Sequence, residues 1–381
     1  MLRRILWLLV ALILCLPLVH AAVEEWGPGP NIDFNGEAWK ARKALLARAR
    51  VFVTTPPDIR TLDLSKTPND PDPIDPAATL ECRYVPEPVT GTQPKFHCVL
   101  PDGDEIKVKY GTTRERHGEV AATRLLAALG FGADHVTMLP RLQCIGCPLF
   151  PFEMREIFES FYAPWVVDLV TSKTQQREFT WVAVERKMAG RGIEVDPVEG
   201  WDWDELSEVD AAKGGATQAE LDALRLMVVF LSHWDNKRSN QRLVCEERDG
   251  SGDDPRAPCT TPLLIMQDVG STFGPGKVKH KEWAAIPMWA DNTNCITSLN
   301  HDSVPYRGGR FEPAHISEGG RQLLAAKLTQ LSEEQIRALF QGARFPEPVS
   351  GDVTGDVTLW VKTFQDKVQQ ISGRTCPSTS G

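Results

Sequence analysis

Two short polar segments carry side chains that could hold a metal ion and act on phosphate groups. The first is H-W-D-N-K-R-S-N, residues 233–240, in which Asn240 stands five residues after Asp235. The second is D-V-G, residues 268–270, and it follows an apolar run. Carboxylate and amide oxygens are the ligands that Mg²⁺ and Mn²⁺ prefer. A positioned carboxylate can also orient an attacking hydroxyl. The two segments together therefore predict metal-assisted phosphoryl transfer.

The same chemistry needs a cation that holds the phosphates and an acid that fixes this cation. Lys107 and Lys109 alternate with apolar residues in a predicted strand, so both side chains point to one face. Glu119 lies near the start of the helix that follows. We expect Lys109, or its neighbour Lys107, to hold the phosphates and Glu119 to pair with that lysine.

The first half of the chain must supply the strands and the helix that position these residues. Turn residues P-D-G-D at 101–104 separate two runs with strand-like alternation, a strong hairpin signal. An apolar stripe ends at Gly130 and predicts a helix over 117–129. The expected strands are 80–85, 95–100 and 105–110, with further strands near 136–142 and 181–184.

The second half reads as mainly helical. A strong helix is predicted over 218–232, directly before the H-W-D segment. Short strands are expected at 241–245 and 263–266, on either side of a polar loop, and residues 316–371 have helical spacing. The predicted fold class is α+β.

Four motifs resemble the secreted Fam20 kinases, and more widely the atypical HipA-like and phosphoinositide-kinase-like groups. The H-W-D-N-K-R-S-N segment has the Asp-to-Asn spacing of the H-R-D-x-x-x-x-N catalytic loop. D-V-G-S-T-F-G at 268–274 is similar to the metal-binding D-N-G-x-x-F-G of those kinases. The helix segment 115–131 and the V-K-Y at 108–110 look like their helix and lysine strand. The resemblance covers about half of the chain through short motifs.

This resemblance implies a two-lobed protein-kinase-like fold, with a small β-rich N-lobe and a mainly helical C-lobe, that uses ATP and Mg²⁺ or Mn²⁺. Asp235 would then be the catalytic carboxylate and Asp268 a metal ligand. Asn240 would take a second metal position, although Fam20 kinases carry an acid there. Lys109 would contact the nucleotide phosphates, and Glu119 would pair with it or approach the metal.

The nucleotide site departs from the family pattern in two places. A glycine-rich loop is missing, and only Gly91 lies in the first turn. Asp268 stands 28 positions after Asn240, which makes a long connection. By the resemblance, residues 184–188 fall at the hinge that holds the adenine. Glu185 and Met188 are therefore expected, with Lys107 and Lys109, to contact the nucleotide.

The N-terminus has the pattern of a secretory signal peptide. Arg3 and Arg4 precede an apolar run at 5–19, which is short for a membrane span of roughly 20 residues. Val19 and Ala21 suit cleavage after Ala21. The expected organisation is a signal peptide at 1–21, an N-terminal extension at 22–80, an N-lobe at 81–184 and a C-lobe at 185–381. The protein would be secreted or periplasmic, and only an uncleaved signal would touch a membrane.

Eight cysteines follow the one in the signal, and an even number in an exported chain predicts disulfides. The locally plausible pairs are Cys82 with Cys98, Cys144 with Cys147 and Cys245 with Cys259, which leaves Cys295 with Cys376. Sequence does not fix this pairing. The C-x-x-C at 144–147 has zinc ligation as an alternative.

The charge balance limits the partners. A net charge of −9 argues against a nucleic-acid-binding surface. The expected partners are a nucleotide and an unknown protein or small-molecule acceptor. Two other functions stay open: nucleotidyl transfer on the same fold, and a pseudokinase or disulfide-stabilised extracellular binding module without catalysis.

Overall fold

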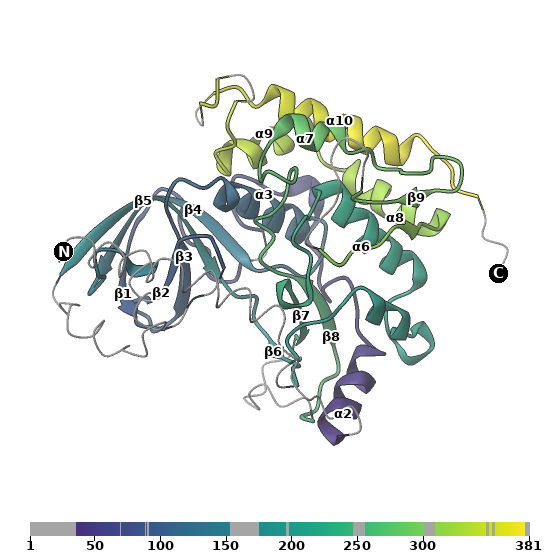
Figure 1. Cartoon of the computed structure of the whole chain (residues 1–381), viewed down its shortest axis with the longest axis horizontal. Coiled ribbons are helices and arrows are strands. Elements are labelled where there is room, and N and C mark those ends of the chain that lie inside the picture. The colour runs from purple at the N-terminus through teal and green to yellow at the C-terminus, as the bar shows by residue number, and fades with distance from the viewer. Residues whose placement is uncertain are drawn as a thin grey trace, which may run out of the picture.

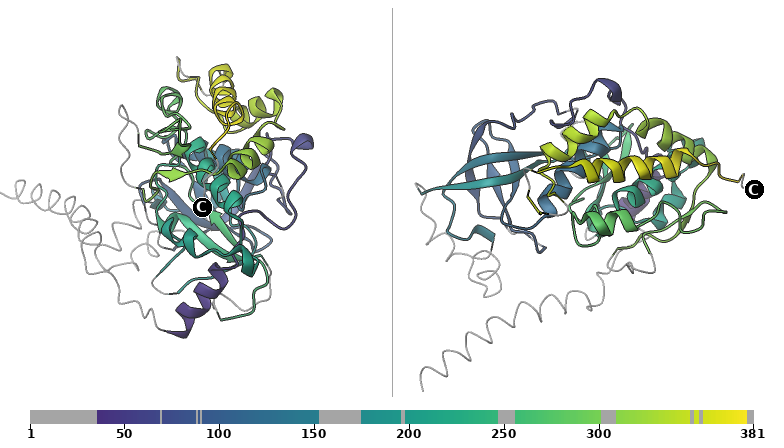
Figure 2. Two further views of the ribbon diagram at one scale, coloured as in Figure 1. Left: turned by 90° about the vertical axis from the view of Figure 1, so that its right-hand side faces the viewer. Right: turned by 90° about the horizontal axis from the view of Figure 1, so that it is seen from above.

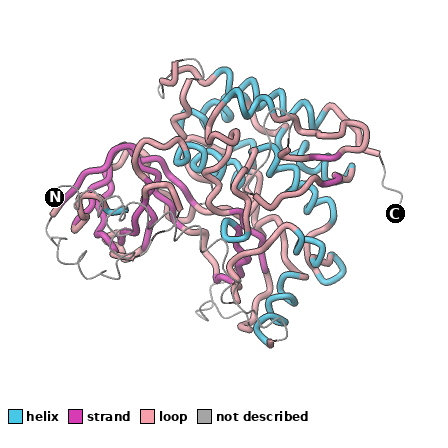
Figure 3. Tube along the Cα trace, viewed as in Figure 1, coloured by secondary structure: helices cyan, strands magenta, loops and turns pink. Residues whose placement is uncertain are grey.

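The computed structural model describes residues 36–377, except 69, 88, 90, 153–174, 196–197, 247–255, 301–308, 348–349 and 353–354. The fold is α+β, as the sequence predicts, with a strand-rich part and a mainly helical part (Figure 1, Figure 3). The predicted signal peptide at 1–21 lies outside the described residues. None of the helices in the described part of the chain has the length and apolar character to cross a bilayer.

Five strands close into a barrel in the order β1-β2-β3-β5-β4. The barrel encloses its own hydrophobic cluster, in which Phe96, Val108 and Leu142 are almost fully buried. The hairpin register places Lys95 opposite Lys109. The strands are β1 (Thr79–Val85), β2 (Lys95–Val99), β3 (Glu105–Lys109), β4 (His135–Ile145) and β5 (Gln176–Arg186). Because β5 runs to Arg186, the domain boundary expected at 184 falls inside a strand.

Helix α3 (Glu115–Ala128) leaves the barrel and is buried along its whole length. Its apolar residues, Val120, Leu125 and Leu126 among them, belong to the large cluster of the helical part, not to the barrel cluster. Figure 1 shows α3 between the barrel strands and the helices above them. Although α3 follows β3 in sequence, its apolar residues therefore pack in the core of the helical part.

The helical part packs around α6 (Gln218–Leu231), which is flanked by α8 (Glu318–Leu328). A cluster of buried aromatic rings, which includes Phe230, Trp283, Phe340 and Trp360, joins the neighbouring helices. Viewed from above, α10 lies across the helical part, on the face turned toward the viewer (Figure 2). The remaining helices are α7 (His280–Ala285), α9 (Glu333–Gly342) and α10 (Thr358–Ser372).

A small antiparallel sheet contributes Leu243 and Leu264 to the large core of the helical part. It contains β6 (Arg191–Gly192), β7 (Gln241–Cys245) and β8 (Pro262–Met266). The Cys245–Cys259 disulfide links β7 to the segment before β8. A second short sheet pairs β9 (Ile296–Thr297) with β10 (Ala314–His315). Short 3₁₀ turns are η1 (Ile59–Thr61), η2 (Asp204–Glu208), η3 (Ala211–Lys213) and η4 (Arg238–Asn240).

Of the residues before β1, those from 37 to 64 pack on the helical part, whereas Thr67 bonds to Val136 of β4. Helix α2 (Glu37–Leu46) buries Leu45 and Leu46 in the large core. Arg42, which is fully buried, forms an ion pair with Glu205 at 2.7 Å. This part of the predicted N-terminal extension is thus integral to the larger core.

All four predicted disulfides are present: Cys82–Cys98, Cys144–Cys147, Cys245–Cys259 and Cys295–Cys376. The C-x-x-C cysteines are bonded to each other, so neither offers a thiolate to zinc, and the zinc alternative is wrong for this structure. Four disulfides are compatible with an extracellular or periplasmic protein.

Candidate functional site

A cavity of about 450 Å³ lies where the barrel meets the two polar loops. Strand residues Lys95, Lys107 and Glu185 line it from the barrel side. Asp235, Asn240 and Asp268 line it from the loops. Side chains up to 173 positions apart along the sequence therefore share one cavity.

The H-W-D loop begins where helix α6 ends. Thr217 and Glu220 form a capping box at the start of this helix, and Ser232 ends it in the left-handed conformation, with φ 50°. Two backbone hydrogen bonds then join this region to the D-V-G segment. Trp234 N donates to Ser271 O at 2.7 Å, and Phe273 N donates to Leu231 O at 2.7 Å. The two loops are held side by side.

The β7–β8 hairpin fixes the ends of both loops. Gln267 N donates to Asn240 O at 3.0 Å, which sets Asn240 next to Asp268 in space despite the 28-residue gap. The Asn240 amide donates from Nδ2 to the backbone oxygen of Asp235 at 2.6 Å, which orients its Oδ1 away from that bond. Asp268 has φ 46°, a strained conformation that non-glycine residues adopt mainly at special sites.

Lys109 is the centre of a buried charge cluster. Its side chain is fully buried, and its Nζ contacts Glu119, lies 2.9 Å from Asp268 Oδ1 and lies 3.2 Å from Glu185 Oε2. Although burial would lower the pKa of Lys109, the three carboxylates raise it well above its usual range. The same lysine holds the pKa of the Asp268 carboxyl far below its ordinary value, against the effect of burial. Both groups are therefore charged at neutral pH.

Lys107 extends the cluster toward the cavity. Its Nζ lies 2.6 Å from Glu185 Oε1, so both strand lysines meet the same carboxylate and lie on one face, as predicted. Burial alone would raise the pKa of Glu185, but Lys107 and Lys109 lower it to about 2.

One carboxyl oxygen of Glu119 lacks a hydrogen-bond partner within the cluster. Its Oε2 is buried and has no hydrogen-bond partner among the described residues. Burial, helped by the charges of Glu185 and Asp268, raises the pKa of Glu119 to about 8 in spite of Lys109. Because Glu119 is largely protonated at neutral pH, a cation bound beside its free Oε2 would favour the ionised carboxylate.

Helix α3 reaches this cluster because two glycines let it approach the D-V-G turn. A Cβ on Gly118 would lie 2.8 Å from the backbone oxygen of Gly270. A Cβ on Gly270 would lie 2.4 Å from Cγ of Glu115. Any larger side chain at either position would push the helix, and with it Glu119, away from Lys109.

Most of the residues singled out in the sequence come together here. Lys107, Glu185, Asp235, Asn240 and Asp268 line the cavity, and Lys109 and Glu119 lie directly behind it. Glu185 points into the lysine cluster, so its carboxylate meets cations there. Met188 does not line this cavity. Its N–H donates to Asp134 Oδ1 at 2.8 Å, and it packs against Val244, Leu263 and Ile265.

Sequence reasoning missed two lysines of the cavity, Lys95 and Lys277. Lys277 contacts Glu115. Lys95 is only 8% exposed, and its side chain makes no hydrogen bond or ion pair in the part of the chain that the structure describes. Burial lowers its pKa despite the nearby charge of Asp268. The hairpin turn at 101–104 was the available signal, because its register sets Lys95 opposite Lys109.

Comparison with known proteins adds little to this geometry. No protein-family model and no curated protein sequence matches the chain. Among solved structures, the Helicobacter pylori proinflammatory kinase CtkA is similar over 78% of this chain and 97% of that chain, with 8% identity and a TM-score of 0.40. A similarity of this size decides nothing about activity.

Proposed function

We propose that this protein is an atypical kinase that transfers the γ-phosphoryl group of metal-bound ATP to a hydroxyl acceptor. One observation carries the proposal: a single cavity unites the loop carboxylate Asp235, the strand-end Asp268, Asn240 and several lysines. In this proposal the barrel is the small N-lobe and the helical part the C-lobe, as the Fam20 resemblance implies. The protein would act after export.

The oxygen ligands suit Mg²⁺ or Mn²⁺. Only Oδ1 of Asp268 is engaged by Lys109, and the orientation of the Asn240 amide leaves its Oδ1 available. The unpartnered Oε2 of Glu119 offers a third oxygen nearby. These three groups would hold the ion, which when bound neutralises charge on the phosphates.

Lys95 is the strongest candidate for the phosphate-binding cation. Lys109 is enclosed by three carboxylates, whereas Lys95 faces the cavity without a bonded partner. Burial of the Lys95 side chain disfavours its charged form, and a phosphate oxygen at its Nζ would offset this cost. Lys109 would then position Asp268 and Glu119, not contact the phosphates itself.

Asp235 would orient the acceptor. Its side chain is 39% exposed in the cavity, so an incoming hydroxyl can reach it. The new bond joins the acceptor oxygen to the γ-phosphorus, and the bond from that phosphorus to the β,γ-bridging oxygen breaks. The hydroxyl proton passes to Asp235 and then to solvent, and ADP leaves.

The test compares the mature chain with Asp235→Asn and Asp268→Asn, and with Asp102→Asn in the exposed 101–104 turn as the matched control. We expect turnover of ATP labelled on the γ-phosphate to need Mg²⁺ or Mn²⁺. Both site variants should lose it while retaining a cooperative melt, and Asp102→Asn should keep it. Label transfer from the α-phosphate instead would favour nucleotidyl transfer.

A binding module without catalysis predicts a different result. A ligand at 100 times its dissociation constant stabilises the folded state by about 2.7 kcal/mol. Absence of both turnover and a melting shift at millimolar ATP with Mn²⁺ would reject the kinase proposal.

A further inference from the structure

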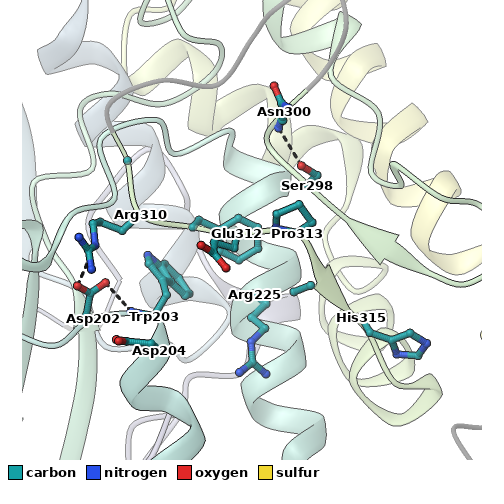
Figure 4. A pocket seen from close by; sticks show the side chains of 13 residues that line it. Asp202, Trp203, Asp204, Arg225, Ser298, Asn300, Arg310, Glu312, Pro313 and His315 are labelled. Atoms are coloured by element: carbon teal, nitrogen blue, oxygen red, sulfur yellow. Dashed lines mark hydrogen bonds and ion pairs between the residues drawn. The ribbon is translucent and has the colours of Figure 1, made fainter.

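Two further cavities continue from the candidate site along the helical part. The first, of about 490 Å³, shares Glu199, Lys237 and Ser239 with the candidate site. It also shares Asp202 and Arg310 with the second, which measures about 910 Å³. Figure 4 shows the second cavity, with the Asp202–Arg310 ion pair at one end and His315 at the other. We call this row of cavities the trough.

The wall of the trough is bonded to the loop that carries Asp235. Asn236 is fully buried, and its Oδ1 accepts hydrogen bonds from Arg310 N at 2.9 Å and Phe311 N at 2.8 Å. Its Nδ2 donates to His233 O at 2.7 Å. The indole of Trp203 donates to Asn236 O at 2.9 Å. A molecule seated in the trough is therefore placed in fixed relation to Asp235.

The cations of the trough are already neutralised by carboxylates of the protein. Arg238 lies 2.6 Å from Glu205, and Arg310 lies 3.0 Å from Asp202. Arg225 lies 3.0 Å from Asp222. Lys237, at the end nearest the candidate site, lies 3.5 Å from Asp235, so each of these cations has a carboxylate partner.

Unlike the cations of the trough, three of its carboxylates have no ion-pair partner among the described residues. Glu199, Asp204 and Glu312 are exposed, and none makes a side-chain hydrogen bond or ion pair with another described residue. They lie at successive points along the trough, starting beside Lys237 near Asp235. The charge left for a ligand is therefore negative and spread along the trough.

We propose that the trough binds the phosphoryl acceptor, and that this acceptor is a basic peptide segment with a serine or threonine hydroxyl. The inference rests on the proposed kinase function. Lysine or arginine side chains on the peptide would pair with Glu199, Asp204 and Glu312 while the hydroxyl reaches Asp235. The row of cavities is extended, which suits a peptide better than a compact amino sugar of the same charge.

Apolar surface supports a peptide as well. Pro313 is exposed on the trough wall, and the buried rings of Trp203 and Phe311, which pack edge to face 5.1 Å apart, support this wall from the core. Such surface packs against the aliphatic stems of lysine and arginine while their charged ends meet carboxylates. The trough thus offers both parts of a basic side chain a matching surface.

The experiment measures phosphorylation of three serine peptides that differ only in lysine, glutamate or glutamine flanks. The variants are Glu199→Gln, Asp204→Asn and Glu312→Gln, and the matched control is Glu178→Gln, an exposed carboxylate on β5. We expect the lysine peptide to be preferred. Each trough variant should raise its KM roughly three- to fivefold without changing kcat, and Asp204→Asn and Glu312→Gln, which lie away from the candidate site, should also leave the KM for ATP unchanged. The control should change nothing.

The outcomes separate this inference from the kinase proposal. ATP turnover with no preference for the lysine peptide, or with a preference that the trough variants leave intact, would overturn the trough assignment alone. Absence of any ATP turnover would remove both. A polycationic amino sugar phosphorylated with the same dependence on Glu312 would overturn the assignment of a peptide. The affinity for the labelled lysine peptide, measured by fluorescence anisotropy, should fall in the trough variants by the same factor as KM rises.

Discussion

At the scale of single residues, the two lysines that face each other across the hairpin have opposite environments. Lys109 is fully buried among three carboxylates, whereas none of the described carboxylates is bonded to the buried side chain of Lys95. Removing one partner of a buried charge cluster leaves uncompensated charge and costs about 3–5 kcal/mol. Lys109 therefore serves the stability of the site, and Lys95 is free to serve a ligand.

Replacement of each lysine by methionine should separate these roles. Lys95→Met should weaken ATP affinity about tenfold to a hundredfold, the range of one or two charge-assisted hydrogen bonds, with little loss of stability. Lys109→Met should lower the free energy of unfolding by about 3–5 kcal/mol. Equilibrium binding and urea unfolding measure the two effects, with exposed Lys281→Met as control. Unchanged ATP affinity in Lys95→Met would contradict the assignment.

Lys367 on α10 permits a prediction about pH. Its Nζ is fully buried and contacts the backbone oxygen of Ile286, and burial lowers its pKa from 10.5 to about 7. Between these pH values the unfolded chain binds a proton that the folded chain lacks, so stability rises with pH. Below pH 7 the buried charge is present in full, with a cost of about 1.4 kcal/mol per pKa unit.

Lys367→Met should therefore be more stable than the parent protein at pH 7, by an amount that shrinks toward pH 9.5. Urea unfolding at the two pH values measures the difference. The Trp283 ring, 5.5 Å from Nζ, favours the charged form. If this contact dominates, the variant will be less stable at both pH values, and the pKa assigned to Lys367 will be wrong.

At the scale of elements, the sequence predicted those whose signals are local. The 101–104 turn and the alternation around it gave β2 and β3, and the apolar stripe ending at Gly130 gave α3. Proximity along the chain also gave three of the disulfide pairs. What the pattern of α3 could not show is its closeness to the 268–270 turn, because that contact depends on the missing side chains of Gly118 and Gly270.

Gly118→Ala tests this close packing. The added methyl would meet Gly270 O at 2.8 Å and Thr272 Oγ1 at 3.0 Å, so α3 must shift away from Asp268. We expect a loss of stability of about 1–3 kcal/mol. Because Glu119 moves with the helix, ATP turnover should fall at least tenfold, as an ångström of misplacement in a site can cost about a hundredfold.

The matched control is Gly319→Ala in α8, where the new Cβ would meet only the Ala219 side chain, at 3.3 Å. Alanine is favoured over glycine within a helix by up to about 1 kcal/mol. That variant should keep full turnover and at least the parent stability. Normal turnover in Gly118→Ala would show that the glycine contact does not position the site.

The sequence predicted that Glu185 lies in the site, but not that its carboxylate pairs with the strand lysines. The family resemblance put residues 184–188 at an adenine hinge, whereas the β3–β5 register sets Glu185 opposite Lys107. Barrel closure decides that pairing, since β5 inserts between β3 and β4. Such an order depends on long-range contacts that no local pattern reports. Lys95 was missed for another reason. A lysine in a strand pattern does not reveal whether its ammonium group has an ion-pair partner.

At the scale of the whole molecule, the site joins two hydrophobic cores. The lysines belong to the barrel, whereas Glu119 and Asp268 come from elements anchored in the large core of the helical part. Lys109 therefore connects the two parts by ion pairs. If the two parts move relative to each other, the ion pairs of Lys109 must lengthen or break. In the proposed function, the nucleotide binds beside these ion pairs.

The disulfides constrain the molecule over very different lengths of chain. Cys295–Cys376 closes a separation of 81 residues and ties the C-terminal end to the segment after α7. Cys245–Cys259 closes only 14 residues. In the chain-entropy account, bonds of these lengths stabilise the folded state by about 4.5 and about 3 kcal/mol. All four of these cysteines are buried, so the loss of packing is similar in the two cases.

Paired alanine substitutions should therefore differ in their effect. Cys295→Ala with Cys376→Ala should lower the free energy of unfolding more than Cys245→Ala with Cys259→Ala, by about 1.5 kcal/mol. Guanidinium unfolding without reductant measures both. The ranking is informative because the shorter bond lies nearer the candidate site, in the β7–β8 hairpin that sets Asn240 beside Asp268. A larger loss for the hairpin pair would mean that local order around the site, not the length of chain closed, governs stability.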